Sequence, residues 1–310
     1  MIENITIIGS GCAGLTAAIY CARANLSPLV IEGFQPGGQL TTTNEIENFP
    51  GFVEGINGFE LTDRMRKQAE RFGACFLSEN VVSVDFSTDV KKIGCSSSTI
   101  QAKAVIVATG AAPRMMNVPG EKKFFGGRGV SVCATCDAPF FREKIVAVIG
   151  GGDSACEEAS FLANFCERVF IVHRRNEFRA SKIVANRARN NPRIAILWDS
   201  VLQEIFGDDK VRGIKIKNVK NNAISEIKCE GVFLAIGHIP NTIPFKSVLE
   251  MDEDGYIIGS GQGAVETSVS GVFVAGDCFD KKFCQAITAA GMGCMAAISA
   301  ERFLANEEFT

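Results

Sequence analysis

Residues 4–14 read NITIIGSGCAG, a β-branched apolar run that ends in a turn with glycines at positions 9, 11 and 14. An amphipathic segment follows at 15–25, and a second apolar run at 28–31 ends at Glu32. This order predicts a strand, a glycine-rich turn, a helix and a second strand. Such a unit is typical of dinucleotide binding, because the glycines let a pyrophosphate approach the backbone at a helix N-terminus.

The same pattern recurs at residues 145–155, IVAVIGGGDSA, followed by a helical segment at 156–165 and an apolar run at 169–172. Both copies close with an apolar strand, a small-residue turn and a proline, at 104–113 and 231–240. A chain of 310 residues is long enough for two domains. We therefore expect two α/β domains of the same dinucleotide-binding class.

The C-terminal part completes neither copy locally. Residues 272–277 predict another buried strand, and 285–303 predict a long helix in which Gly291 and Gly293 permit close packing. We expect this segment to return to the first domain, so that the fold is two Rossmann-like domains with the second inserted into a discontinuous first. The expected boundaries are 1–112 and 242–310 for the first domain and 113–241 for the second.

The residues after the second strand differ between the two copies. The first copy has Glu32, whose carboxylate suits the ribose of FAD or NAD. The second has His173, Arg174 and Arg175, with Arg179 about one helical turn further on. Guanidinium groups suit the extra phosphate of NADP, although the same arginines could be a solvated helix start. Two different dinucleotide sites indicate a flavoprotein that moves electrons between nicotinamide and flavin.

Twelve cysteines are present, and Cys133 and Cys136 alone have C-x-x-C spacing. In such a motif one thiol can lower the pKa of the other, and the pair can form a redox-active disulfide. A structural zinc site is disfavoured because no second C-x-x-C exists, so we expect no metal; inert packing is the other alternative. Asp137 is placed to exchange a proton with a thiol, or to cap a helix. Most other cysteines should pack as small apolar side chains.

The overall charge and hydropathy exclude several classes of function. A net charge of −3 provides no basic face for nucleic acid. No apolar run approaches the roughly 20 residues that span a bilayer, and the N-terminus lacks the features of a signal peptide. We therefore expect a soluble, cytoplasmic protein that is bound neither to a membrane nor to nucleic acid.

With these motifs in hand, the chain resembles the low-molecular-weight thioredoxin reductases over nearly its whole length. The segments that carry the resemblance are 9–11, 37–43 (GGQLTTT), 47–51 (ENFPG), 133–137 (CATCD), 173–175 (HRR) with 178–180, 276–277, 285–288 (QAIT) and 293–297.

The resemblance implies FAD in the first domain, NADPH in the second, thioredoxin as the partner and a homodimer. It implies that Cys136 faces the flavin, Cys133 attacks thioredoxin and Asp137 is the acid–base group. The residues implied for FAD are Ser10, Gly11, Cys12, Ala13, Glu32, Gly38, Gln39, Asn48, Val81, Asp277, Cys284, Gln285 and Ala286. Those implied for NADPH are Gly150, Gly152, Ser154, His173, Arg174, Arg175 and Arg179, with Ile236 and Tyr256 flanking it.

Three positions depart from the family pattern. Cys12 replaces a proline in the first glycine-rich turn, which should matter little for a backbone contact. Ala138 replaces a glycine, so the backbone there must avoid positive φ. Cys284 replaces an arginine and removes a cation near the expected flavin region.

Two alternatives to thioredoxin reduction remain at this point. A related flavoprotein reductase could use a different disulfide protein as its acceptor. A nucleotide-sensing protein could instead use the C-x-x-C to report redox state, although sensing does not require two dinucleotide sites.

Overall fold

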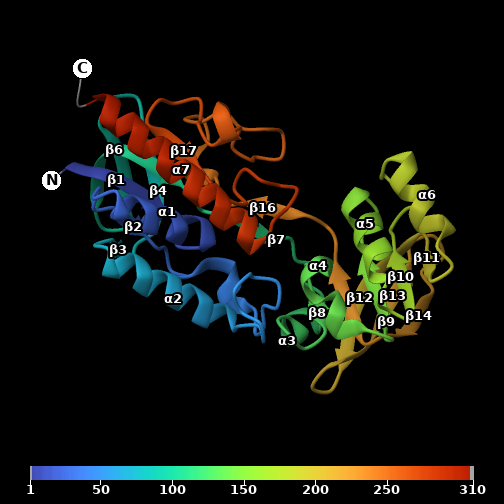
Figure 1. Ribbon diagram of the computed structural model, residues 1–310. Coiled ribbons are helices and arrows are strands. Elements are labelled where there is room, and N and C mark those ends of the chain that lie inside the picture. The colour runs from blue at the N-terminus through green and yellow to red at the C-terminus, as the bar shows by residue number, and fades with distance from the viewer. Residues whose placement is uncertain (1, 308–310) are drawn as a thin grey trace. The chain divides into compact units, whose positions relative to one another are not determined.

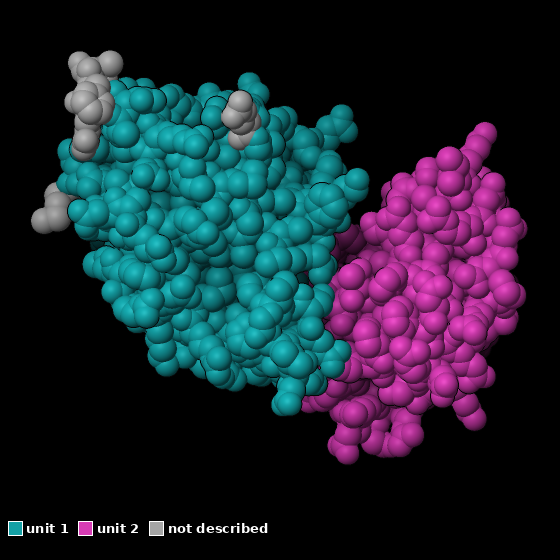
Figure 2. Space-filling model, viewed as in Figure 1, with its two compact units in different colours: residues 1–112, 239–310 teal, residues 113–238 magenta. Residues whose placement is uncertain are grey.

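The computed structural model describes residues 2–307, which form two compact units. The first unit contains residues 1–112 and 239–310, and the second contains 113–238 (Figure 2). The second unit is thus inserted into a discontinuous first, and the later crossing falls after His238, ahead of the expected residue 241. The crossing segments are β7 (Ala111–Pro113) and β16 (His238–Pro240), which pair as a two-stranded sheet.

The first unit is built on a mostly parallel sheet of order β3-β2-β1-β6-β5-β4, with β17 also paired to β6 (Figure 1). The β1, β2, β3, β6 and β17 pairings are parallel, whereas β4 and β5 add an antiparallel edge. Residues 104–107 of β6 are fully buried, as a central strand covered on both faces requires. The strands are β1 (Ile2–Ile8), β2 (Leu29–Ile31), β3 (Cys75–Leu77), β4 (Val81–Asp85), β5 (Lys91–Cys95), β6 (Thr99–Val107) and β17 (Val272–Val274).

Helices α1 (Cys12–Arg23) and α7 (Ala286–Glu307) pack against each other in the first unit. Gly293 makes this crossing possible, because a Cβ there would lie 2.1 Å from the carbonyl oxygen of Ala13. Gly291 plays no such role, since a Cβ there meets nothing within 4 Å; that expectation was wrong. The remaining helices of the unit are α2 (Gly58–Arg71) and the short 3₁₀ turns Gly38–Thr42, Ile243–Phe245 and Gln262–Ala264.

The second unit has a parallel sheet of order β11-β10-β9-β15-β8 and a separate antiparallel sheet β12-β13-β14. The strands are β8 (Val130–Ser131), β9 (Ile145–Ile149), β10 (Arg168–Val172), β11 (Ile194–Leu197), β12 (Ser200–Gly207), β13 (Val211–Asn218), β14 (Ile224–Lys228) and β15 (Gly231–Leu234). The helices are α3 (Glu121–Phe124), α4 (Ala134–Asp137), the 3₁₀ turn Ala138–Phe141, α5 (Asp153–Leu162) and α6 (Lys182–Asn190).

Each unit has a glycine-rich turn between a parallel strand and the following helix, β1 and α1 in the first and β9 and α5 in the second, as the sequence predicts. Helix α5 ends at Leu162 and not near residue 165, because Ala163 to Cys166 form a turn that leads into β10. No helix in the described part of the chain, residues 2–307, is both long and apolar enough to cross a membrane.

Candidate functional site

The glycine-rich turn of the first unit presents bare backbone at the start of α1. A Cβ on Gly9, whose φ is +110°, would lie 2.2 Å from the carbonyl oxygen of Ala108, and one on Gly14 would lie 1.9 Å from that of Gly9. A Cβ on Gly11 would meet nothing within 4 Å. Gly9 and Gly14 therefore hold the strand, turn and helix together, whereas Gly11 faces open space where a ligand phosphate fits.

A second loop lies directly over this turn. A Cβ on Gly38 would lie 3.2 Å from the Cα of Gly11, and the Gly37 N–H donates to the Ser10 hydroxyl at 3.1 Å. Gln35 fixes the loop from within by donating to the Gly38 carbonyl at 3.2 Å. The structure thus brings Ser10, Gly11 and Gly38 together, while Gln39 is exposed on the same turn.

Glu32 stands at the end of β2 and is buried, with its carboxylate already bonded. The Arg66 Nε donates to it at 3.0 Å, and the Ser78 hydroxyl donates at 3.0 Å. An ionised carboxylate has about four acceptor positions, so Glu32 keeps capacity for a ribose hydroxyl. Neither Arg66 nor Ser78 could be predicted as a partner of Glu32 from a local pattern, because they lie 34 and 46 residues away along the chain.

The turn after β17 carries two acidic side chains of the first unit. Burial, and secondarily the charge of Asp280, raises the pKa of Asp277 to about 6. Asp280 accepts the N–H groups of Lys282 and Phe283, but its Oδ2 is buried without a hydrogen-bond partner. Such an unsatisfied oxygen is uncommon in a native protein and indicates a missing polar partner.

Two cysteines lie within the electrostatic reach of Asp277. Burial, together with this carboxylate, raises the pKa of Cys12 and of Cys284 to about 12. Cys284 also has a φ of +46°, which is rare for a residue with a side chain. Both thiols therefore stay protonated and are poor nucleophiles.

Other residues expected at this site are dispersed through the first unit. Asn48 donates to Gln285 at 3.3 Å across 237 residues of sequence, next to Ala286 at the start of α7. Val81 is half-buried at the start of β4 and packs against the core. Tyr256 is buried in this first unit, and its pKa is raised by burial first and then by the charges of Cys284, Asp254 and Asp277. The structure therefore does not place Tyr256 in the unit that contains the arginines.

The glycine-rich turn of the second unit has the same division of roles. A Cβ on Gly150 would lie 2.4 Å from the carbonyl oxygen of Ala235, whereas one on Gly152 would meet nothing within 4 Å. Gly152 precedes α5 directly, and Ser154 is exposed in the first turn of that helix. Ile236 follows the end of β15 and packs against the core of this unit.

His173 is a structural brace of this turn rather than an exposed ligand group. It is 5% exposed, and its Nε2 lies 2.9 Å from the Glu177 carbonyl oxygen. A Cβ on Gly151 would lie 2.1 Å from its Nδ1, so the ring fills the space under the turn. Burial is the main cause that lowers the pKa of His173. The imidazole therefore holds the arginine loop against the glycine-rich turn.

Arg174, Arg175 and Arg179 are exposed on this loop. The Arg179 N–H donates to the Gly151 carbonyl at 2.8 Å, which brings the loop to the turn. The segment is irregular and not helical, because α6 begins only at Lys182. The three arginines are therefore not part of a helix start, which was the alternative interpretation. In residues 2–307 none of the three guanidinium groups has an ion-pair partner, so they form a cluster of free positive charge.

Cys133 and Cys136 are joined by a disulfide in the second unit. Cys133 precedes α4, and its sulfur accepts the Cys136 N–H at 3.2 Å. Ala134 and Ala138, on either side of Cys136, are buried in the core with Ala155 and Ala159 of α5. This packing holds the disulfide at one side of a short helical turn.

Asp137 ends α4 next to the disulfide. Burial raises its pKa, and a hydrogen bond from Ser131 opposes that shift. Its carboxyl group can therefore hold a proton closer to neutral pH than an exposed aspartate does. Ala138 has a φ of −53°, so the alanine fits without strain, as expected from its departure from the family glycine.

The other ten cysteines are free thiols, and seven of them are buried. This confirms that most cysteines serve as small apolar side chains. In the described residues, no group of three or more His, Cys, Asp or Glu side chains is arranged to hold a metal ion.

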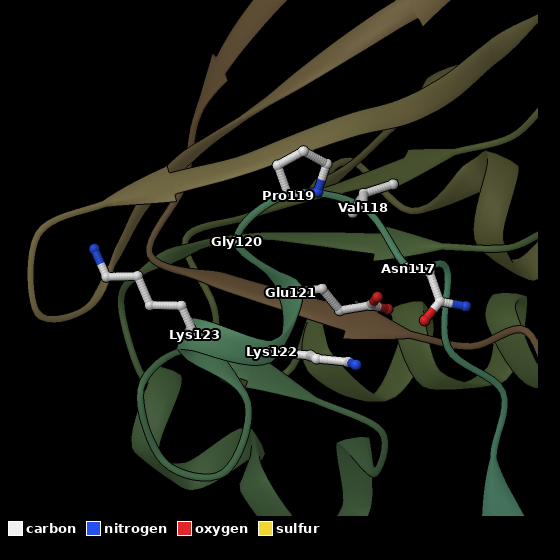
Figure 3. A pocket seen from close by; sticks show the side chains of 7 residues that line it. All are labelled: Asn117, Val118, Pro119, Gly120, Glu121, Lys122 and Lys123. Carbon is white, nitrogen blue, oxygen red and sulfur yellow. The ribbon is translucent and has the colours of Figure 1, made fainter.

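A surface pocket of the second unit is formed by one run of chain, residues 117–123 (Figure 3). Glu121 lies in its wall and is fully buried, where it accepts the Met116 N–H at 2.7 Å. None of the residues expected to bind a nucleotide lines this pocket, so the glycine-rich turns remain the candidate sites.

The sequence matches the family of pyridine nucleotide-disulphide oxidoreductases over residues 3–293. It is 52% identical to thioredoxin reductase 1, mitochondrial, of Arabidopsis thaliana, over 97% of this chain and 84% of that protein. It is 51% identical to the thioredoxin reductase of Streptomyces coelicolor, over 98% of this chain and 94% of that protein. The solved thioredoxin reductase of Giardia duodenalis is 44% identical, with a TM-score of 0.93, over 97% of this chain and 98% of that chain. The chain therefore belongs to the pyridine nucleotide-disulphide oxidoreductase family and, within it, to the thioredoxin reductases.

Proposed function

We propose that this chain passes electrons from NADPH through FAD to the Cys133–Cys136 disulfide and from there to oxidised thioredoxin. The observation that carries the proposal is the disulfide itself, which lies in the same unit as three free arginines and a glycine-rich turn. A redox-active pair in the same unit as an NADP-type site is what a nicotinamide-driven disulfide reductase needs.

The first unit fits FAD. Gly11 faces open space at the start of α1, and Gly38 closes over it, so the pyrophosphate has a backbone cradle. Glu32 retains acceptor capacity for a ribose hydroxyl, and the buried Oδ2 of Asp280 shows that the turn after β17 lacks a polar partner. We infer that Ser10, Gly11, Cys12, Ala13, Glu32, Gly38, Gln39, Asn48, Val81, Asp277, Cys284, Gln285 and Ala286 hold or line this cofactor.

The second unit fits NADPH. Gly150, Gly152 and Ser154 offer backbone and hydroxyl donors at the start of α5 for the pyrophosphate. The free guanidinium groups of Arg174, Arg175 and Arg179 match the 2′-phosphate, with His173 holding their loop in place. Ile236 would flank the nucleotide from the end of β15.

When bound, FAD supplies the capacity to accept the hydride of NADPH and to release two electrons to a disulfide. Opening the Cys133–Cys136 bond takes these two electrons and two protons, one delivered with the hydride and one from solvent. Cys133 would then attack the thioredoxin disulfide as a thiolate, and Cys136 would displace the reduced thioredoxin while the enzyme disulfide re-forms. Asp137 would hold the proton that the departing thiolate takes up.

The proposal is tested with the purified protein. We expect a bound flavin in the visible spectrum and NADPH oxidation that requires added oxidised thioredoxin. The alternative is a related reductase with another acceptor, and a panel of disulfide proteins and small disulfides separates the two. Lack of bound flavin, or NADPH oxidation that thioredoxin does not stimulate, would contradict the proposal.

We also infer a homodimer in the cytoplasm. The support is the resemblance to dimeric reductases, and ten free thiols, which are typical of a reducing compartment. Sedimentation equilibrium tests the first inference, and cell fractionation tests the second.

A further inference from the structure

Glu158 of α5 is a half-buried residue whose carboxyl group has no task in the proposed electron path. Its Oε2 is buried and has no hydrogen-bond partner. Helix α5 packs directly against α4, and Ala155 and Ala159 share a core cluster with Ala134 and Ala138. An unsatisfied buried carboxyl oxygen is uncommon in a native protein, because leaving it without a hydrogen bond is unfavourable.

The Glu158 carboxyl reaches the backbone beside the disulfide. The N–H of Ala134 faces it, and Ala134 directly follows Cys133. Burial raises the pKa of Glu158 to about 7, and the Ala134 amide is the one group that opposes this shift. A glutamate that is half ionised near neutral pH therefore lies behind the first residue of the dithiol motif.

Charged side chains near Glu158 are not the cause of its raised pKa. Its pKa shift arises from burial and the Ala134 amide, not from an ion pair. The charged side chains on the elements packed against it are Asp137 on α4, Asp153 and Glu157 on α5, Arg168 on β10, and Lys182, Arg187 and Arg189 on α6.

We propose that Glu158 is a second proton-holding carboxyl of the dithiol centre, a positioning residue whose ionisation competes with that of the Cys133 thiol once the disulfide is open. This role rests on the proposed function, because it requires a reductant that opens the disulfide. In that reaction, NADPH and one proton convert the disulfide into two thiols and NADP⁺. A negative charge on Glu158 then disfavours the Cys133 thiolate, and a proton on Glu158 removes that penalty.

The test measures the Cys133 thiolate directly in the full-length, flavin-containing protein. Cys136→Ser leaves Cys133 as a single thiol, and its alkylation by iodoacetamide is followed by mass spectrometry as a function of pH. Glu158→Gln in this background mimics the protonated carboxyl in nearly the same volume. The matched control is Glu167→Gln, which removes one exposed carboxylate from the same unit.

We expect the Glu158 and Glu158→Gln profiles to coincide near about pH 5, where both side chains are neutral, and to diverge to roughly tenfold faster alkylation of the variant near about pH 8. The Glu167→Gln profile should follow that of the parent. Profiles that superimpose at every pH overturn the proposal. A uniform offset at every pH also overturns it, because that result indicates displaced packing and not ionisation.

This experiment does not read thioredoxin turnover, so the two proposals fail separately. Divergent profiles in a protein that does not reduce thioredoxin contradict the proposed function and support the role of Glu158. Superimposable profiles in a protein that does reduce thioredoxin contradict the role of Glu158 alone.

Discussion

Asp277 is a residue whose burial should lower the stability of the fold at neutral pH. Burial, and secondarily the charge of Asp280, raises the pKa of its carboxyl group to about 6. The folded state therefore binds the proton more tightly than the unfolded state does. The stability linked to this group is present at acid pH and is lost as the pH rises from the ordinary value of 3.8 through about 6.

Replacing this carboxyl should stabilise the flavin-free protein. Asp277→Asn should raise the free energy of unfolding near neutral pH by roughly 2–3 kcal/mol, and the gain should vanish below about pH 4. Urea unfolding of the flavin-free variants over this pH range measures the difference. Asp89→Asn, an exposed site in the same unit, should change nothing; a gain of equal size at every pH would contradict the account.

The arginines of the second unit are expected to determine the preference for NADPH over NADH. Replacement of both Arg174 and Arg175 by Gln should raise the KM for NADPH about 10- to 100-fold and leave the KM for NADH unchanged, because only NADPH has the extra phosphate. Arg187→Gln removes one exposed guanidinium from α6 and should leave both constants unchanged. Steady-state kinetics with each nucleotide measure both KM values. An equal rise in the KM for NADH would contradict the role of the arginines in binding the extra phosphate.

At the scale of elements, the crossing of α1 and α7 depends on one glycine. Gly293→Ala should lower the free energy of unfolding by about 2 kcal/mol or more, since its Cβ would lie 2.1 Å from a backbone oxygen of α1. Gly291→Ala, two positions earlier, should stabilise the chain by up to about 1 kcal/mol, because alanine favours the helix and the space is open. Urea unfolding compares the two, and equal effects would mean that the close crossing is not a constraint.

Most helices and strands of the two nucleotide-binding folds could be predicted from the sequence. The periodicity of apolar residues, the spacing of glycines and the runs of β-branched residues are all local signals. Strand β9 occupies the predicted residues 145–149, and β17 returns to the first sheet. The antiparallel strands β12 to β14 were not predicted, since their burial pattern is irregular and their pairing is set by tertiary contacts.

The residues of the candidate sites could be predicted only where they belong to a recognisable sequence motif. The glycine turns and the C-x-x-C were visible in the sequence, and the structure places them as expected. The partners of Glu32, the bracing role of His173 and the burial of Glu158 depend on contacts between distant segments or on exclusion of water. No local pattern encodes these features, so they appear only in the folded chain.

For the whole molecule, the two units divide the work of one reaction. The first has the cradle that fits FAD, and the second has both the disulfide and the arginines that fit NADPH. Neither unit alone has all the parts that transfer of electrons from NADPH to a disulfide protein requires. The Cys133–Cys136 pair is therefore the group expected to pass electrons onward to the disulfide protein.

The most direct test is Cys136→Ser, measured beside Cys75→Ser, which alters an exposed cysteine outside the pair. We predict that Cys136→Ser lowers NADPH-dependent thioredoxin reduction at least about a hundredfold while NADPH still bleaches the flavin, because only the step after the flavin is lost. Cys75→Ser should retain full activity. Continued thioredoxin reduction by Cys136→Ser would contradict the central claim.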